Sequence, residues 1–235
     1  MKTYPVIHFS NRELALEQVA LAQGAGASGV FLISHYGNDA ELVNVACEAK
    51  QLHPDFAIGI NLLSKAPLEA ARRALEAELD MVWADSMGVD SRGLRVEGSA
   101  LAELAKTNPR LQFFASVAFK YREPEFYPAL AAQEATKAGF IATTSGAATG
   151  SAPEVSKIAS MFAAAGGRLA VASGMTPENV SSFVPFLSHI LVATGVSIDE
   201  FRIDEAKLKL FIANVEVARA TGLTDVHVLA QDNAI

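Results

Sequence analysis

Short apolar segments alternate with helical patterns along the whole chain. In one of the apolar segments, Ile58 and Ile60 alternate with small or polar residues, as in a β-strand. The residues that follow place Leu68, Ala71 and Leu75 on one face of a helix. The same reading predicts eight strands, at Tyr4–His8, Gly29–Ser34, Phe56–Asn61, Met81–Asp85, Gln112–Phe119, Phe140–Thr144, Arg168–Ala172 and His189–Thr194.

Eight strands that alternate with eight helices imply parallel βαβ units. The count fits the α/β class and a closed (β/α)8 TIM barrel, because a doubly wound open sheet usually has fewer strands. No shift in composition marks a domain boundary, so residues 1–235 are predicted to form a single domain. The last long helix is expected over 204–221 with Gly222 as its stop, which leaves 222–235 as a C-terminal tail.

Several helix starts carry recognisable capping residues. Ser10, followed by Glu13 three residues later, forms a capping box before the first helix. Ser151 is expected to cap the sixth helix, and Thr176 with Pro177 predicts the start of the seventh.

The connection from Ser86 to Gly98 is polar and longer than a usual βα loop. It is expected to close over the mouth of the barrel as a lid, with Arg92 or Arg95 available to meet an anion. The helix after the fifth strand is expected to open near Glu123-Pro124.

Composition narrows the classes of partner. The net charge of −7 and pI of about 5.3 provide no overall basic field for nucleic acid or an anionic membrane, so a phosphate would need a local site. The single cysteine, Cys47, rules out an internal disulfide and a cysteine-based zinc cluster. Without a visible secretory signal or an apolar run of about 20 residues, we expect a cytoplasmic protein with no integral membrane segment.

Three turns rich in Gly, Ser and Thr follow the last three predicted strands. Glycine permits close backbone approach to a ligand, and hydroxyl groups donate hydrogen bonds. The first two turns are expected to lead directly into helix starts, whose free N–H groups favour an anion. Together they predict one shared site for a small phosphorylated metabolite, with phosphate-binding candidates Ser145, Gly146, Thr149, Gly150, Ser173, Gly174, Thr194 and Gly195.

Catalytic candidates lie where strands end, since TIM-barrel active sites sit at the C-terminal ends of the strands. Alternation along the strands places Asn61, Ser116 and Lys120 inside the mouth. Asp85 and Lys120 resemble an acid/base pair, and a desolvated lysine could also form a Schiff base. The alternative for these two residues is a solvent-facing salt bridge at the start of a loop.

Histidines supply further candidates. His8 ends the first strand, where it either orients a substrate hydroxyl or serves as a hydrogen-bonded structural residue, and His35 lies in the next mouth turn. His8, His35 and Asp85 could meet across the mouth, but no HxH or HExxH spacing supports a metal site. The sequence therefore requires no cofactor and gives only weak support to a divalent metal.

Four segments resemble the BtpA/SgcQ family. Residues 58–63 are similar to its GIN-x-L strand, 117–121 to its D-V-x-x-K-H segment, 145–150 to its TG-x-x-TG turn and 173–180 to its GSG-V-TPENV turn. The resemblance implies a TIM barrel akin to the ribulose-phosphate-binding superfamily. Three positions depart from the family pattern: Tyr121 replaces a histidine, Ala115 or Ser116 stands in place of an aspartate, and Ser145 replaces a threonine.

Two functions follow as hypotheses. The first is an enzyme of the isomerase, epimerase or lyase type that acts on a small phosphorylated sugar or related metabolite. The second is a non-catalytic phospho-ligand-binding or complex-assembly protein of the BtpA type. A homo-oligomer is also considered, with the apolar stretches 183–187 and 226–229 as interface candidates and core packing as their alternative explanation.

Overall fold

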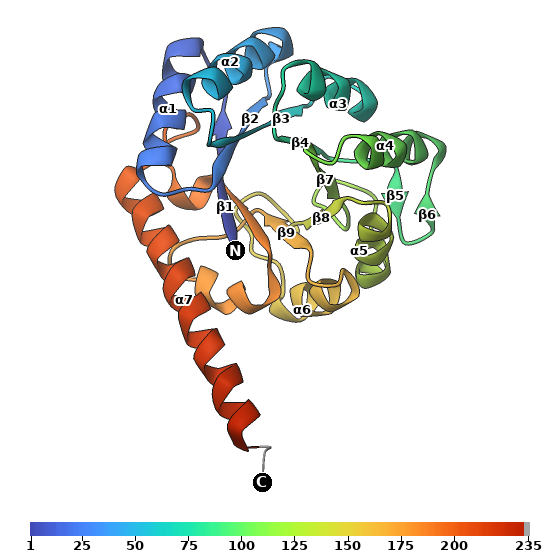
Figure 1. Ribbon diagram of the computed structural model, residues 1–235, viewed down its shortest axis with the longest axis vertical. Helices are drawn as coiled ribbons and strands as arrows, with labels where there is room; N and C mark the ends of the chain where they lie inside the picture. Colours follow the sequence, from blue (N-terminus) through green and yellow to red (C-terminus); the bar gives the residue numbers. More distant parts are fainter. Residues whose placement is uncertain (233–235) are drawn as a thin grey trace.

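The computed structural model describes residues 1–232, with side chains through residue 222. Its strands close into one parallel barrel in the order β1-β10-β9-β8-β7-β4-β3-β2, with helices around the outside (Figure 1). This arrangement confirms the predicted α/β TIM barrel. The barrel strands are β1 (Lys2–His8), β2 (Gly29–Ser34), β3 (Ala57–Leu62), β4 (Met81–Ala84), β7 (Gln112–Ser116), β8 (Ile141–Thr144), β9 (Leu169–Ala172) and β10 (His189–Val192).

Seven α-helices occur in the described part of the chain, where eight were predicted. The helix expected after β9 is replaced by two 3₁₀ turns, η1 (Val180–Ser182) and η2 (Val184–Phe186). Pro185 lies inside this segment and has no backbone N–H, which explains why an α-helical ladder does not form there. The α-helices are α1 (Arg12–Gly24), α2 (Asp39–Leu52), α3 (Pro67–Glu76), α4 (Val96–Thr107), α5 (Pro128–Lys137), α6 (Val155–Ala164) and α7 (Glu205–Asp232).

Two predicted N-caps are wrong. The side chain of Asn11, rather than Ser10, caps α1 by accepting a hydrogen bond from the Leu14 N–H. Ser151 does not cap α6, which begins only at Val155. Pro153 accounts for the delay, because the residue before a proline is pushed toward extended backbone.

Two further helix boundaries differ from the prediction. The expected start near Glu123-Pro124 is replaced by a loop that runs to Pro128. At the other end of the chain, Gly222 does not stop the last helix, since α7 continues to Asp232. A single glycine in a helix costs only about 1 kcal/mol and need not end it. The side chains of 223–232 and all of 233–235 lie outside the described residues, as does the interface candidate 226–229.

An aromatic layer fills the barrel. Tyr4, Phe31 and Phe114 point inward and meet edge to face, with ring centroids 5.1–6.0 Å apart. Such contacts add to the stabilisation from apolar burial. Because β3 and β7 alternate in register with this layer, Asn61 and Ser116 also point inward, as predicted.

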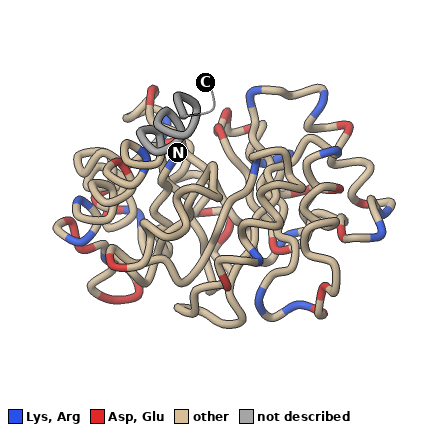
Figure 2. Tube along the Cα trace, turned by 90° about the horizontal axis from the view of Figure 1, so that it is seen from below, with Lys and Arg blue, Asp and Glu red and all other residues tan. Residues whose placement is uncertain are grey.

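A second core lies between the strands and the helices. The stretch 183–187 belongs to it, since Phe183, Val184 and Leu187 are buried there. Core packing therefore accounts for this interface candidate. No helix among the described residues is long and apolar enough to cross a membrane. Seen from the side in Figure 2, acidic and basic residues are interspersed rather than separated onto faces of opposite sign.

Candidate functional site

Lysine 120 reaches toward β8 rather than β4. Its Nζ donates to Thr149 Oγ1 at 3.1 Å, and the pKa of the amine is lowered mainly by burial. Tyr121 and Asp85 oppose this shift, but Lys120 and Asp85 form no ion pair, so the salt bridge considered as the alternative role of these two residues is not present. Positive φ angles at Ala118 and Tyr121 turn the chain in this direction.

Asparagine 61 is the partner of Asp85. Asn61 Nδ2 donates to Asp85 Oδ1 at 3.5 Å, at the end of β3 and just beyond β4. Ser116, the third mouth candidate in this region, accepts a hydrogen bond from the Trp83 indole at 2.9 Å and is buried. Its hydroxyl therefore helps to hold the aromatic layer, while Ser116 also lines the cavity beside this site.

The two mouth histidines lie together. His8 and His35 meet edge to face with ring centroids 5.2 Å apart, and burial, then His35, lowers the pKa of His8. A neutral His8 imidazole follows near pH 7. Its Nδ1 is buried and has no hydrogen-bond partner. Within the described residues no group of three or more His, Cys, Asp or Glu side chains could hold a metal, so His8, His35 and Asp85 do not converge as ligands.

The three glycine-containing turns contact one another. A Cβ at Gly146 would overlap the Ser151 carbonyl oxygen, and a Cβ at Gly174, where φ is +73°, would overlap the backbone of Ser151 and Ala152. A Cβ at Gly195 would overlap the Met175 carbonyl. Gly146 thus closes the first turn on itself, whereas Gly174 and Gly195 permit contact between turns. The predicted shared location of the turns is observed, although the close backbone approach is made by protein rather than by a ligand.

A backbone donor remains open on these turns. In the part of the chain that the structure describes, the N–H group of Gly174 donates to no protein acceptor. Ser173, with φ of +145°, accepts from the Gly150 N–H at 3.2 Å and ties the first turn to the second. Non-glycine residues with positive φ are strained and cluster at functional sites.

Two predictions about the phosphate turns need correction, one for Ser145 and one for the helices expected after the first two turns. The Ser145 hydroxyl is buried and bonded to the Lys120 N–H at 2.8 Å and the Gly146 carbonyl at 2.9 Å. Neither of the first two turns leads directly into an α-helix, since extended chain follows the first and η1 the second. The third turn instead forms a 3₁₀ turn, η3 (Thr194–Val196), at the rim.

Lysine 157 is a mouth residue that the sequence patterns did not indicate. From the first turn of α6 its Nζ donates to the carbonyls of Ala118 at 3.0 Å and Ser145 at 2.9 Å. Burial lowers the pKa of this amine. Thr144 Oγ1 also donates to the Ala118 carbonyl, at 3.0 Å. Lys157 thus joins the loop that carries Lys120 to the first glycine turn.

The polar connection after β4 is a fixed hairpin rather than a free lid. Its strands are β5 (Val89–Asp90) and β6 (Gly93–Leu94). Arg92 and Arg95 both bind Asp90, at 2.6 and 2.7 Å, and hold the pKa of that carboxyl well below its usual range. Both arginines, including the candidate Arg95, therefore have Asp90 as a partner in this arrangement, while their exposed side chains also line the cavity beside the hairpin.

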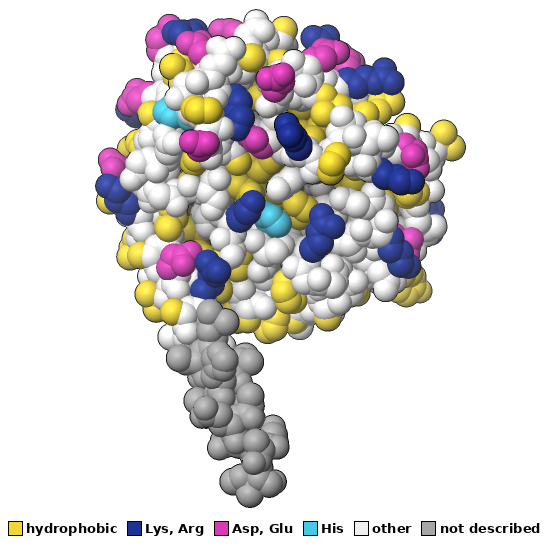
Figure 3. Space-filling model, in the orientation of Figure 1, with side chains coloured by type: hydrophobic (Ala, Val, Ile, Leu, Met, Phe, Trp, Pro, Cys, Tyr) yellow, Lys and Arg dark blue, Asp and Glu magenta, His cyan; other side chains and the backbone are white. Residues whose placement is uncertain are grey.

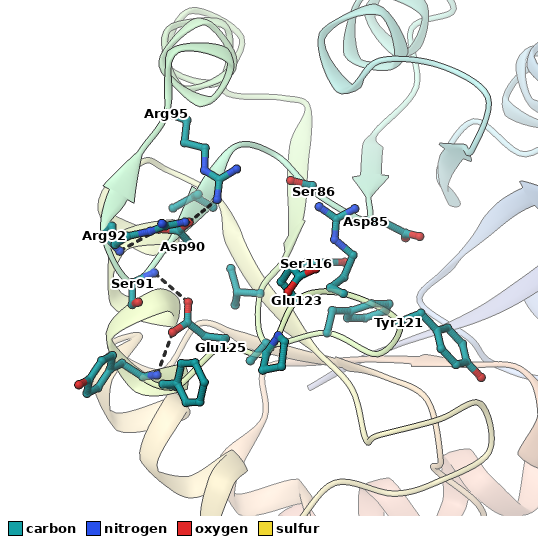
Figure 4. Close-up of a pocket in the computed structure, with 18 residues that line it drawn as sticks. Asp85, Ser86, Asp90, Ser91, Arg92, Arg95, Ser116, Tyr121, Glu123 and Glu125 are labelled. Atoms are coloured by element: carbon teal, nitrogen blue, oxygen red, sulfur yellow. Dashed lines mark hydrogen bonds and ion pairs between the residues drawn. The ribbon is translucent and has the colours of Figure 1, made fainter.

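A cavity of about 720 Å³ separates this hairpin from the loop 119–127. Figure 4 shows Asp85 and Tyr121 extending to one side of it and the Asp90 cluster on the other. Glu125 joins the two walls by accepting from the N–H groups of Ser91 at 3.0 Å and Tyr127 at 2.8 Å. Arg122 also lines the cavity and, among the described residues, forms no hydrogen bond or ion pair.

No family model matches the chain, and no curated protein matches it by sequence. Among solved structures, it is similar to a phosphoribosyl anthranilate isomerase from Thermus thermophilus, with a TM-score of 0.67 and 17% identity over 92% of this chain and 99% of that one. It is also similar to a thiamine phosphate pyrophosphorylase from Pyrococcus furiosus, with a TM-score of 0.66 and 16% identity over 92% and 96%. A third similar structure is a 4-hydroxy-2-oxoglutarate/2-dehydro-3-deoxyphosphogluconate aldolase from TTHB1. Its TM-score is 0.62, with 13% identity over 91% of this chain and 94% of that one. At these identities the likeness shows the fold.

Proposed function

We propose that the protein is an enzyme of the isomerase, epimerase or lyase type that acts on a small phosphorylated sugar or related metabolite. Its phosphate binds the backbone donors of Gly174, Thr194 and Gly195, with Thr149 as the neighbouring hydroxyl. The observation that carries the proposal is that the turns after β8, β9 and β10 touch one another and leave the Gly174 N–H without a protein acceptor. Unpaired backbone donors at a glycine-containing rim favour an anion.

The reactive groups lie beside these turns. Lys120 contacts Thr149, so a phosphate bound at Gly174 would bring its carbon chain toward the amine. A lysine with a lowered pKa is suited to proton transfer or to Schiff-base formation with a carbonyl. The Asn61–Asp85 pair, with His8 beside His35 at the mouth, provides partners for substrate hydroxyls. The roles of these four residues are therefore kept, but Asp85 acts through Asn61 rather than through Lys120.

The cavity gives the substrate room beyond its phosphate. Asp85 and Tyr121 line its inner edge, and Tyr121 Oη accepts from the Thr149 N–H at 3.1 Å. A ligand anchored at the turns can therefore extend past Tyr121 toward Arg122. The names of the three similar proteins refer to phosphoribosyl, thiamine phosphate and phosphogluconate compounds, which supports a phosphorylated substrate for this barrel.

The test is turnover of a panel of sugar phosphates by the wild-type protein and by Lys120→Met. The variant is expected to lose turnover while ligand binding remains. Lys137→Met is the matched control, because Lys137 only pairs with Glu134 on the surface of α5. Equal turnover by Lys120→Met and the wild-type protein would remove Lys120 from the mechanism. The proposed reaction requires no cofactor, so turnover should survive a chelator, and rescue of chelated protein by a divalent cation would contradict that part.

The missing Asp85–Lys120 ion pair favours a second candidate, a non-catalytic phospho-ligand-binding or assembly protein of the BtpA type. A protein of this second kind would bind phosphate at the same site but would need no group for proton transfer. Binding of a phosphorylated ligand without turnover of any tested substrate, together with capture of a stable protein complex, would support it over the enzyme.

A further inference from the structure

The end of the barrel opposite the mouth carries an unusual layer of polar side chains. Along β1, β7 and β10 the inward positions Tyr4, Phe114 and Leu191 belong to the aromatic and apolar interior. The next inward-facing positions, two residues closer to the amino-terminal ends of the strands, are polar. Lys2 lies directly beside His189 in the β1–β10 register, and β9 on the other side of β10 is preceded by Arg168. The polar positions of this layer are Lys2, Gln112, Arg168 and His189.

His189 is held rigidly. Its ring stacks on Tyr4, with centroids 6.0 Å apart and planes 18° apart, and meets Phe114 edge to face at 5.4 Å. Nδ1 lies 2.8 Å from Ser188 Oγ, whose own proton is donated to the Leu169 carbonyl at 2.9 Å. Nδ1 must therefore donate to Ser188, which leaves Nε2 to gain or lose the titrating proton.

Positive charge surrounds this ring without a counter-charge. Burial, then Lys2, the amino terminus and Arg168, lowers the pKa of His189 to about 4, and no carboxylate acts against them. Lys2 and Arg168 form no hydrogen bond or ion pair through their side chains in the described part of the chain. Figure 3 shows a histidine between two basic side chains near the centre of this face. The arrangement is notable in a chain whose net charge is −7.

The acidic groups nearby are committed elsewhere. Asp80, which acts on Tyr4, pairs with Lys50 at 2.9 Å and accepts the Ile58 N–H at 2.8 Å. On α7, Glu216 pairs with Arg219 at 3.2 Å. Glu216 also acts on the amino terminus, but no carboxylate acts on His189 itself.

We propose that Lys2, Arg168 and His189 form an anion-binding site at the amino-terminal end of the barrel, and that its ligand is a small dianionic oxyanion such as phosphate or a phosphoryl group. The two cations supply charge-assisted hydrogen bonds, and the protonated Nε2 of His189 supplies a third donor fixed in direction. Because the bound anion favours protonation of His189, protonation must strengthen anion binding to the same extent. This site is independent of the mouth, which lies at the other end of the strands.

The experiment is an NMR titration of the histidine ring signals with sulfate at pH 5.5, in which chloride keeps the ionic strength constant. His189 is assigned from the His189→Gln variant, and His8 and His35 report the mouth in the same spectra. The proposal expects a saturable shift of the His189 signal and an apparent His189 pKa that rises with sulfate. Arg168→Gln should weaken sulfate binding about tenfold, as for loss of one charge-assisted hydrogen bond.

Arg72→Gln is the matched control. Arg72 is exposed on α3 and is not among the cations that act on His189, so its loss should leave sulfate binding there unchanged. An unmoved His189 signal, or equal weakening by Arg168→Gln and Arg72→Gln, would overturn the site. Because phosphate binding at the mouth moves His8 or His35 instead, failure here is distinguishable from failure of the proposed function. Unchanged His8 and His35 signals in Arg168→Gln show that the variant is folded.

Discussion

Replacement of Lys157 by methionine tests how the mouth is assembled. Methionine keeps the length and apolar stem of the side chain but removes the ammonium group. The Ala118 carbonyl retains its bond from Thr144, whereas the buried Ser145 carbonyl loses its only side-chain donor. Lys157→Met therefore removes two bonds but leaves one carbonyl without a partner.

The magnitude follows from these bonds. A buried carbonyl left unpaired costs about 1–3 kcal/mol, and loss of the second bond adds about 1 kcal/mol. Relief of the burial that lowers the Lys157 pKa offsets part of this loss. The expected decrease in the free energy of unfolding is about 2–3 kcal/mol, which corresponds to a fall of roughly 5–10 °C in Tm for a chain of this size.

The assay is urea unfolding of Lys157→Met beside Lys137→Met, which removes only an exposed ion pair worth at most about 1 kcal/mol. Lys157→Met should also bind phosphorylated ligands more weakly, because the Lys120 loop and the first glycine turn lose the side chain that joins them. If Lys157→Met is no less stable than Lys137→Met, the two hydrogen bonds do not hold the mouth as described.

Three further predictions follow. Gly174→Ala should destabilise the protein and abolish phosphate binding, because its Cβ overlaps Ser151 and Ala152. Gly150→Ala has open space around its Cβ and should cost only about 1 kcal/mol for its φ of +77°. Equal effects of the two variants in unfolding and binding assays would refute this contrast. Because folding lowers the pKa of His189 from 6.5 to about 4, the unfolded state takes up the proton first, so stability should fall by up to about 3 kcal/mol as the pH drops through that window. His189→Gln should lose less over the same range in urea unfolding at low sulfate, and an identical pH dependence would show that His189 does not contribute. The rate of acylation of Lys120, followed by mass spectrometry against pH, should reach its midpoint below 10.5, and a midpoint at or above that value would contradict its partial burial.

Alternation of side chains along the strands was the reliable guide to the barrel. It placed Asn61 and Ser116 inward, because a strand inside a closed parallel barrel has little freedom in its register. The same alternation fails at Phe119: counted from Phe113 it would face the helices, but it packs against Trp83 inside the barrel. The strand ends at Ser116, and the positive φ of Ala118 then rotates the chain.

The site itself depended on contacts that local patterns do not encode. The direction of Lys120 is set by non-glycine residues in the left-handed region, which no propensity predicts. The commitment of Arg95 to Asp90 depends on a hairpin turn of a few residues. Lys157 was overlooked because a lysine in the first turn of a helix normally faces solvent, and a sequence signal for its burial is absent.

The central claim is that the turns at the mouth hold a phosphate. Its most direct test is the thermal unfolding midpoint of the wild-type protein and of Gly174→Ala with a panel of sugar phosphates, the matching unphosphorylated sugars and inorganic phosphate. A ligand that binds only the folded state raises the midpoint by mass action. We predict a rise with at least one sugar phosphate, no rise with its unphosphorylated sugar, and loss of the effect in Gly174→Ala. No rise with any phosphorylated ligand, or an equal rise with the unphosphorylated sugar, would contradict the account.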